Sequence, residues 1–196
     1  MNWTGRDNNP VYGAAAVILA GGKSTRMGCD KRFLPFSGKP LVQHIYEQVS
    51  SRFAQTMIAT ATPETLDCCN AVMVIDETPG LGPLGGIASA LAATQYDLCF
   101  VLPCDMPRID FALMTRLLQA APGADCALPI WESGMYEPLF GAYGKSSLPH
   151  IKKAITAGER KVMRALTLCS IATVLVQTTR LDNMNTPEDY RRCCEH

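Results

Sequence analysis

Apolar residues along this chain form short continuous runs, and stretches with helical periodicity separate them. The run from Ala14 to Leu19 reads AAAVIL, and the run from Asp97 to Leu102 reads DLCFVL. Runs of this length without polar alternation are typical of strands buried on both faces of a sheet. Further extended segments are predicted at Thr56 to Ala61, Ala71 to Ile75 and Ile171 to Gln177.

The intervening stretches favour helices. Leu41 to Ser51 is amphipathic, and the pattern also predicts helices at Pro83 to Thr94, Phe111 to Ala121 and Lys145 to Leu168, the last broken at Gly158. Alternating strands and helices indicate parallel strands joined by helical crossovers. We therefore expect an α/β fold, Rossmann-like, with a mostly parallel sheet and helices on both faces. Residues 125–143, which include CALPI and WESGMYEPLFGAY, predict a strand and then a hairpin or arm inserted over the sheet.

The length and the first residues predict the domain organisation. A chain of 196 residues suits one α/β domain with a sizeable core. Residues 1–12 are polar and include Asn8-Asn9-Pro10, which is typical of a flexible leader. We expect a leader over 1–12 and a single domain over 13–196.

Charge and cysteine content narrow the functional class. The 18 basic residues balance the 18 acidic ones, so the basic surface of a general nucleic-acid binder is not expected. The chain has no apolar run of membrane-spanning length and no signal-peptide pattern, which predicts a cytoplasmic protein without a membrane partner. Nine cysteines, an odd number, and three widely separated histidines favour reduced thiols over disulfides or structural zinc.

The loop after the first strand is a candidate phosphate site. Its sequence from Leu19, LAGGKSTRMGCDK, contains GGKST, but a P-loop needs a glycine where Val17 lies in the predicted strand. The loop nevertheless combines two glycines with Lys23, Arg26 and Lys31 beyond a strand end, where open α/β sheets bind ligands. The competing interpretation is a simple turn with solvated cations.

Two later loops follow predicted strands in the same way. Asp76 to Gly86, DETPGLGPLGG, leads into a helix whose free amides can meet a base or an anion. Alternatively, it is a helix-entry turn with Pro83 at the first helical position and glycines for close packing. In PCDMP, Asp105 is placed to bind a magnesium ion that bridges phosphates, because Asp110 is an alternative cap for the next helix. Cys104 is interpreted as a small buried filler, not a nucleophile.

The last segment of interest is LDNMNTPED, from Leu181 to Asp189. Asn183 and Asn185 lie two positions apart, so in extended backbone they face one side and can hold a metal or a metal-bound phosphate. The segment is also a good helix start, with Thr186 as the cap and Pro187 at the first position. Both interpretations can hold together.

These segments, in this order, resemble the nucleotidyltransferase family that includes the molybdenum cofactor guanylyltransferases, the MobA-like proteins. The matching motifs are LAGGKSTRMGCDK at Leu19, GKPL at Gly38, GPLGG at Gly82, PCDMP at Pro103, EPLFGAY at Glu137 and NMNTPED at Asn183. The resemblance implies a nucleotidyltransferase of Rossmann-like fold that uses Mg²⁺ and joins GTP to molybdopterin, the molybdenum cofactor precursor. Its products would be the guanine dinucleotide cofactor and pyrophosphate.

The resemblance also implies roles for individual residues. Arg26, Lys31 and Asp105 would be catalytic, with the two cations on the phosphates and Asp105 on magnesium and the nucleotide. Asn183 and Asn185 would lie on the pterin and phosphate side. The remaining nucleotide-binding positions would be Leu19, Ala20, Gly21, Gly22, Asp76, Gly82, Pro83 and Leu84. The interval between Asp76 and Gly82 is about one residue shorter than in the family pattern, so either Asp76 or its neighbour Glu77 is the functional carboxylate.

Other functions stay open at this point. A related enzyme would use CTP for the same pterin, or would activate a sugar or polyol phosphate; Gly21-Gly22 favours GTP, because cytidylyl pterin enzymes in this superfamily often have LAAG in place of LAGG. A non-catalytic nucleotide-binding partner in molybdoenzyme assembly is a further alternative, although it would not need Lys31 and Asp105 together. Transient contacts with cofactor-synthesis or molybdoenzyme assembly proteins are expected in either case.

Overall fold

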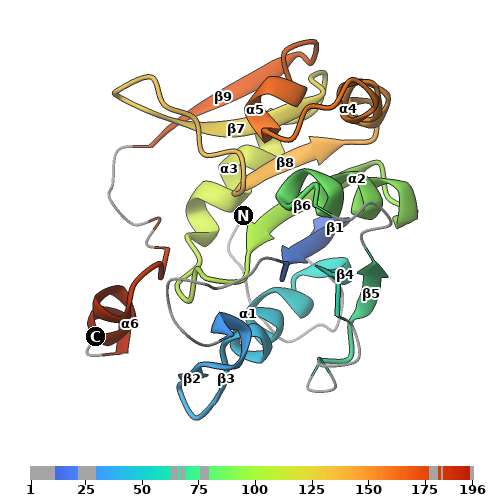
Figure 1. Cartoon of the computed structure of the whole chain (residues 1–196). Coiled ribbons are helices and arrows are strands. Elements are labelled where there is room, and N and C mark those ends of the chain that lie inside the picture. Colours follow the sequence, from blue (N-terminus) through green and yellow to red (C-terminus); the bar gives the residue numbers. More distant parts are fainter. Residues whose placement is uncertain are drawn as a thin grey trace.

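A computed structural model describes residues 12–21, 30–62, 66, 69–75, 80–176, 181 and 183–194. Among these residues, seven strands form one sheet in the order β5-β4-β1-β6-β8-β7-β9 (Figure 1). The strands are β1 (Tyr12–Leu19), β4 (Phe53–Thr60), β5 (Val72–Ile75), β6 (Leu98–Pro103), β7 (Cys126–Trp131), β8 (Gly141–Gly144) and β9 (Ile171–Val176). All neighbouring pairs are parallel except those of β8, which is antiparallel to β6 and β7. The mostly parallel sheet is therefore confirmed.

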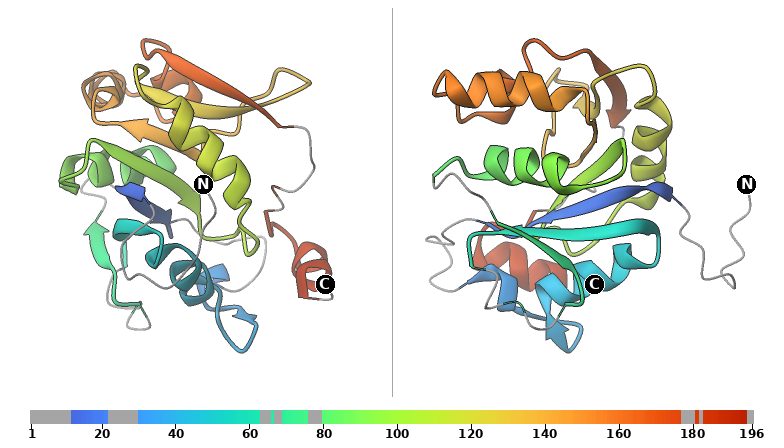
Figure 2. Two further views of the ribbon diagram at one scale, coloured as in Figure 1. Left: turned by 180° about the vertical axis from the view of Figure 1, so that it is seen from behind. Right: turned by 90° about the vertical axis from the view of Figure 1, so that its right-hand side faces the viewer.

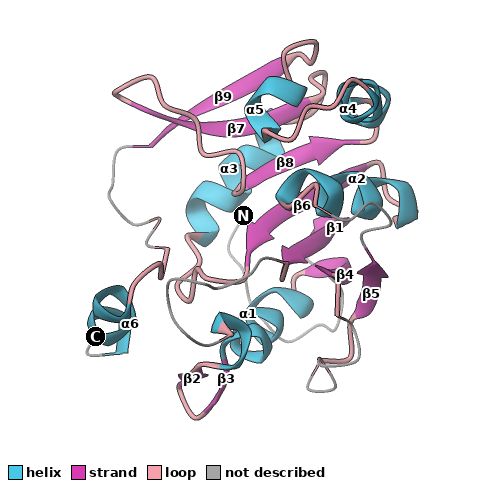
Figure 3. Cartoon of the chain, in the orientation of Figure 1, coloured by secondary structure: helices cyan, strands magenta, loops and turns pink. Residues whose placement is uncertain are grey.

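Helices cover both faces of the sheet (Figures 2 and 3). They are α1 (Leu41–Ser50), α2 (Pro83–Ala93), α3 (Phe111–Ala120), α4 (Ser147–Thr156), α5 (Val162–Ala165) and α6 (Pro187–Cys194). Alternate β1 residues point to opposite faces, as the pleat requires. Ile18 packs in a core with α1 and α3, whereas Val17 packs in a second core with α2, α4 and α5. This arrangement confirms the expected helices on both faces.

Some boundaries differ from the expected ones. β4 begins at Phe53, three residues before the predicted start. The hydrophobic pattern missed its first half because that half is only partly apolar. Gly158 adopts φ +86° and ends the α4 segment, so the predicted break is confirmed. In the part of the chain that the structure describes, no helix is long and apolar enough to cross a membrane.

The segment after β7 lies partly within the sheet. The expected hairpin is confirmed, since β7 and β8 pair antiparallel, but its expected position over the sheet was wrong, because β8 inserts between β6 and β7 and pairs with both. In the connection between β7 and β8, Tyr136 forms an antiparallel β-bridge with Ile130 at the end of β7. Pairing with two neighbours, rather than lying over them, satisfies the backbone groups of this short strand.

Three small elements near the first loop have no counterpart in the sequence pattern. They are the 3₁₀ turn η1 (Lys31–Phe33) and the hairpin of β2 (Pro35–Phe36) and β3 (Lys39–Pro40). Elements of two or three residues are too short to produce a periodic signal. Their position matters because η1 carries Lys31.

Candidate functional site

The candidate site lies where three adjacent parallel strands end. β1 lies between β4 and β6, and Leu19 has Ala59 and Pro103 as its partners across the two ladders. The backbone N–H of Ala20 donates to the carbonyl of Ala59 at 2.9 Å, and that of Cys104 donates to the carbonyl of Leu19 at 3.1 Å. The segments that follow β1, β4 and β6 therefore emerge together at the carboxyl edge, where ligands bind in open α/β sheets.

Lys31, Asp105 and Asn185 meet at this edge. Lys31 Nζ lies 3.3 Å from Asp105 Oδ2 and 3.0 Å from Asn185 Oδ1. The Lys31 and Asp105 side chains are 14% and 21% exposed, so water screens the ion pair only in part. Residues from the first, third and last predicted loops are thus brought into direct contact.

Asp105 is held by groups around it. Burial raises the pKa of its carboxyl, while the Lys31 ammonium opposes that shift. Its backbone carbonyl accepts a hydrogen bond from the Met184 N–H at 2.8 Å, which joins the C-terminal segment to the β6 end. Asp110 caps α3 by accepting from the Leu113 N–H at 2.9 Å. Asp110 is therefore confirmed as the cap of α3, and the Asp105 side chain contacts Lys31 instead, while its role as a magnesium ligand stays a prediction.

The carboxylate of Asp105 and two amide oxygens of the C-terminal segment are donors that suit a hard cation. Lys31 Nζ contacts both Asp105 and the amide oxygen of Asn185, and the buried Oδ1 of Asn183 has no hydrogen-bond partner among the described residues. No group of three or more His, Cys, Asp or Glu side chains suited to a metal occurs among the described residues. One carboxylate with amide oxygens fits magnesium, which commonly takes one or two carboxylates and completes its shell with water and phosphate oxygens.

Glu137 is a residue of this region to which the sequence assigned no role. Burial raises the pKa of its carboxyl, and the negative charge of Asp105 adds to that shift. A cation placed near Asp105 would lower the pKa of that carboxyl and offset its effect on Glu137. Glu137 belongs to the motif EPLFGAY, but neither its spacing nor its residue type indicated that the charge of Asp105 affects its pKa.

The predicted helix start in the C-terminal segment is confirmed, while the binding of a metal or phosphate by Asn183 and Asn185 stays a prediction. Thr186 Oγ1 accepts from the Asp189 N–H at 3.1 Å, which confirms Thr186 as a helix cap. Asp189 Oδ2 in turn accepts from the backbone N–H groups of Asn185 and Thr186, at 3.1 and 2.9 Å. The Asp189 carboxylate thus fixes the backbone of Asn185, while the Asn185 side chain contacts Lys31.

The loop before α2 is a helix-entry turn. Gly82 precedes the helix with φ +59°, a left-handed conformation that favours glycine, and Pro83 follows at the start of α2. A Cβ on Gly86 would lie 3.0 Å from Leu19 Cδ2 and 3.2 Å from Ala59 Cβ, so this glycine allows the predicted close packing of helix on sheet. The Leu84 side chain is fully buried, so any contact from this position to a nucleotide would come from its backbone.

The other predicted residues are placed as follows. Leu19 and Ala20 are buried at the end of β1, and Gly21 is exposed just beyond them. Gly22, Arg26 and Asp76, together with Lys23 and Glu77, lie outside the described residues. Cys104 packs partly against the core, and burial raises the pKa of its thiol to about 12. A thiol of this kind is not a nucleophile near neutral pH, in agreement with its interpretation as a filler.

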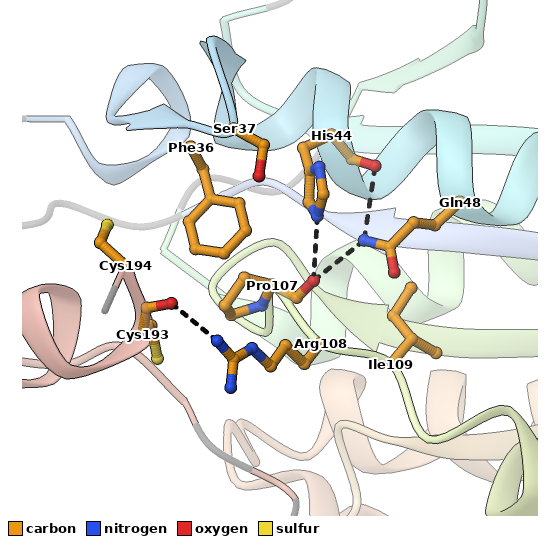
Figure 4. Close-up of a pocket in the computed structure, with 9 residues that line it drawn as sticks. All are labelled: Phe36, Ser37, His44, Gln48, Pro107, Arg108, Ile109, Cys193 and Cys194. Carbon is orange, nitrogen blue, oxygen red and sulfur yellow. Dashed lines mark hydrogen bonds between the residues drawn. The ribbon is translucent and has the colours of Figure 1, made fainter. Parts of the chain in front are cut away.

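A separate cavity of about 500 Å³ lies between α1, the connection that follows β6, and α6 (Figure 4). His44 and Gln48 of α1 both contact the Pro107 carbonyl, at 3.2 and 2.9 Å. Arg108 Nη2 donates to the Cys193 carbonyl at 3.0 Å. None of the predicted site residues that the structure describes lines this cavity, and these polar groups join α1 and α6 to the loop that follows Asp105.

Comparisons with known proteins decide the family. Residues 16–171 match the profile of the MobA-like NTP transferase domain. The chain belongs to the MobA-like nucleotidyltransferase family. The resemblance inferred from the motifs is therefore confirmed, and so is nucleotidyltransferase as the class of enzyme.

Individual members of the MobA-like family match nearly the whole chain. The molybdenum cofactor guanylyltransferase of Syntrophotalea carbinolica is 33% identical over 189 residues, with 91% of this chain and 89% of the relative covered. That of Shewanella amazonensis is 35% identical over 183 residues, with 90% and 93% covered. Among solved structures, the molybdopterin-guanine dinucleotide biosynthesis protein A of Archaeoglobus fulgidus superposes with a TM-score of 0.80 at 27% identity, covering 92% and 97% of the two chains.

Proposed function

We propose that this protein transfers GMP from GTP to the terminal phosphate of molybdopterin, yielding the guanine dinucleotide cofactor and pyrophosphate. The observation that carries the proposal is the contact of Lys31 with both Asp105 and Asn185 at the carboxyl edge of the sheet. The relatives named molybdenum cofactor guanylyltransferase, which match about nine-tenths of the chain, support this choice of substrates.

The reaction joins two anions by an in-line displacement at the α-phosphorus, so the protein must neutralise charge and align the partners. It needs no covalent nucleophile. Lys31 would place its ammonium on the phosphates, and Arg26 would stabilise charge on the departing pyrophosphate. By analogy with lost oxyanion donors, removal of one such cation is expected to raise the barrier by about 2.7–4 kcal/mol.

Mg²⁺ is part of the proposal, because the oxygen donors around Asp105 fit it. Asp105 would hold the ion, with the Asn183 and Asn185 amide oxygens on the substrate side. When bound, Mg²⁺ supplies positive charge to phosphate oxygens. Without the metal ion, Lys31 offsets the negative charge of Asp105, since its Nζ lies 3.3 Å from the carboxylate. A cytoplasmic location and transient contacts with proteins that supply molybdopterin or receive the product belong to the same proposal.

Nucleotide selectivity tests this function. Purified protein with Mg²⁺ and molybdopterin generated in place receives GTP, CTP, ATP or UTP at equal concentration, and pyrophosphate release is followed. We expect release with GTP that requires molybdopterin and falls by roughly 10²–10³-fold in Lys31→Ala. Lys152→Ala is the matched control, because Lys152 is an exposed residue of α4, away from Asp105.

The other outcomes separate the alternatives. A preference for CTP would make the protein a cytidylyltransferase of the same cofactor. Release that depends on a sugar or polyol phosphate would contradict the pterin substrate. Tight nucleotide binding without release under any condition would identify a non-catalytic partner in molybdoenzyme assembly.

A further inference from the structure

The turn η1, which carries Lys31, is not fixed by burial in the core. None of its three residues is buried, and Phe33 is 39% exposed. Apolar packing therefore contributes little to its position. Polar contacts of its neighbours must hold Lys31 within reach of Asp105, and Arg32 makes most of those that the structure describes.

Arg32 binds two separate groups with its guanidinium. On one side, Nε lies 2.9 and 3.0 Å from the two carboxylate oxygens of Asp30, and Nη2 lies 2.5 Å from Oδ2. On the other side, Nη1 donates to Thr60 Oγ1 at 3.0 Å and to Thr62 Oγ1 at 2.9 Å. The Arg32 side chain is 13% exposed and the Asp30 side chain 39%, so the bonds to the threonines are partly buried whereas the Asp30 pair is open to water. A planar fork of this kind fixes both distance and orientation.

Each partner of Arg32 is itself fixed. Thr60 is 2% exposed at the last position of β4, and its Oγ1 also accepts from the Thr62 N–H at 3.2 Å. Asp30 caps η1 by accepting from the Arg32 N–H at 3.0 Å. The hydrogen bonds from Arg32 hold the pKa of Asp30 below its usual value, so Asp30 stays ionised at neutral pH. The turn is thereby attached to β4, an inner strand of the sheet.

Two consecutive residues thus reach in opposite directions across the end of β1. Arg32 contacts the end of β4, while Lys31 contacts Asp105 beyond β6, and β1 lies between these two strands. The distance from Thr60 to Asp105 is set by the ladder. Fixing Arg32 on the β4 side therefore sets how far Lys31 Nζ extends toward Asp105 and Asn185.

We infer that Arg32 is a positioning residue for the transferase reaction: by joining Asp30 to Thr60 and Thr62 it holds Lys31 in contact with Asp105 and Asn185. The inference deepens the proposed function and rests on it for the role of Lys31. Arg32 acts through Lys31. Its Asp30 and threonine contacts also predict that lysine cannot replace it, because an ammonium lacks the two-sided fork.

Amine labelling tests the positioning directly and needs no turnover. A short pulse of an acetylating reagent, read by mass spectrometry, gives the labelling of Lys31 relative to the exposed Lys152 of the same molecule. In Arg32→Ala and Arg32→Lys we expect this ratio to rise roughly tenfold, because local opening of η1 releases the amine. Arg116→Ala is the matched control, since Arg116 is an exposed residue of α3.

A second variant guards against general unfolding. Thr60→Val with Thr62→Val removes the two threonine acceptors of Arg32 together with the bond from the Thr62 N–H to Thr60 Oγ1, keeps the Asp30–Arg32 pair and preserves side-chain shape. The ratio is expected to rise in this variant as well, by less than in Arg32→Ala. An unchanged ratio in the double variant, or equal labelling gains at all lysines in both variants, would overturn the inference.

Chemical rescue links the positioning to catalysis. Millimolar guanidinium is expected to restore several-fold the pyrophosphate release that Arg32→Ala loses, through kcat more than through KM. It should restore nothing in Lys31→Ala. Absence of rescue with unchanged Lys31 labelling would contradict a positioning role. If the unmodified protein releases no pyrophosphate but the labelling ratios change as expected, the proposed function fails while the control of Lys31 by Arg32 stands.

Discussion

Asp105 is a carboxylate whose surroundings disfavour its charge even though a lysine lies beside it. Burial is the largest influence and raises its pKa above 3.8, and the Lys31 ammonium only partly reverses this. A group maintained at such a cost is typical of a functional site, where stability is exchanged for chemistry. Burial also raises the pKa of Glu137, and the negative charge of Asp105 adds to that shift.

Replacement of Asp105 by asparagine is therefore expected to change how stability depends on pH. The pKa of Asp105 is higher in the folded state than in the unfolded state. Between these two pKa values the folded state binds more protons, so the free energy of unfolding falls as pH rises from 3.8 to the folded pKa. Asp105→Asn lacks this loss. Urea denaturation in EDTA at a series of pH values should show the stability of the variant, relative to the wild type, increasing from about pH 4 upward.

Asp189→Asn is the control for this measurement. Hydrogen bonds from the Asn185 and Thr186 N–H groups lower the pKa of Asp189, so the stability it contributes is present above pH 3.8 and is lost as pH falls below that value. Its difference from the wild type should be nearly flat toward neutral pH. A flat or falling curve for Asp105→Asn would show that Lys31, and not burial, dominates the carboxylate.

At the scale of elements, β8 depends on the absence of a side chain at Gly141. A Cβ there would lie 2.6 Å from Leu128 Cδ2 and 3.0 Å from the Ala127 backbone oxygen. The backbone oxygen belongs to the paired strand β7 and cannot move away alone. Gly141→Ala is expected to lower the free energy of unfolding by about 1–3 kcal/mol, as overpacking does.

Gly13→Ala is the matched control for this substitution. Gly13 also lies in a strand, β1, but a Cβ there would meet nothing within 4 Å. Its effect should stay within about 0.5 kcal/mol. Chemical denaturation of the three proteins decides the matter, and equal stability of Gly141→Ala and Gly13→Ala would show that β7 and β8 separate readily.

The elements that the sequence predicts are those whose signal is local. β1 and β6 are buried on both faces, so their apolar runs are continuous. The α3 cap is local too, because Asp110 accepts from the N–H of Leu113, three residues along the chain. β8 has four residues, GAYG, and becomes a strand only because β6 and β7 lie on either side. Such pairing leaves no local pattern.

The candidate site divides in the same way. Lys31, Asp105 and Asn185 are recognisable one by one, since each follows or begins a predicted element. Their contacts span 74 and 154 residues, so only the folded sheet establishes them. Arg32 reaches Thr60 and Thr62 across 28 and 30 residues, and no motif indicates that pairing.

At the scale of the whole molecule, the C-terminal segment joins the two sides of the site. Met184 is fully buried and its N–H donates to the Asp105 carbonyl, while Asn185 contacts Lys31. Further along, the Tyr190 hydroxyl donates to the Pro35 carbonyl and the Cys193 carbonyl accepts from Arg108 (Figure 4). α6 therefore anchors the chain that delivers Asn185, beside the hairpin of β2 and β3 and away from the sheet (Figure 1).

Removal of residues 187–196 is expected to reduce activity far more than stability. All seven strands of the main sheet precede residue 187, and Cys193 is the buried residue of α6, so the sheet should persist. The truncation removes Asp189, which holds the Asn185 backbone, and Tyr190, which holds the helix. A displacement of about 1 Å at Asn185 would lower kcat by roughly a hundredfold.

Deletion of residues 195–196 alone leaves α6 intact and is the control. If the longer truncation kept full kcat while its melting temperature fell steeply, α6 would stabilise the core and would not position Asn185. Asn185 is the residue through which the C-terminal segment contacts Lys31, so a loss of its position should lower kcat.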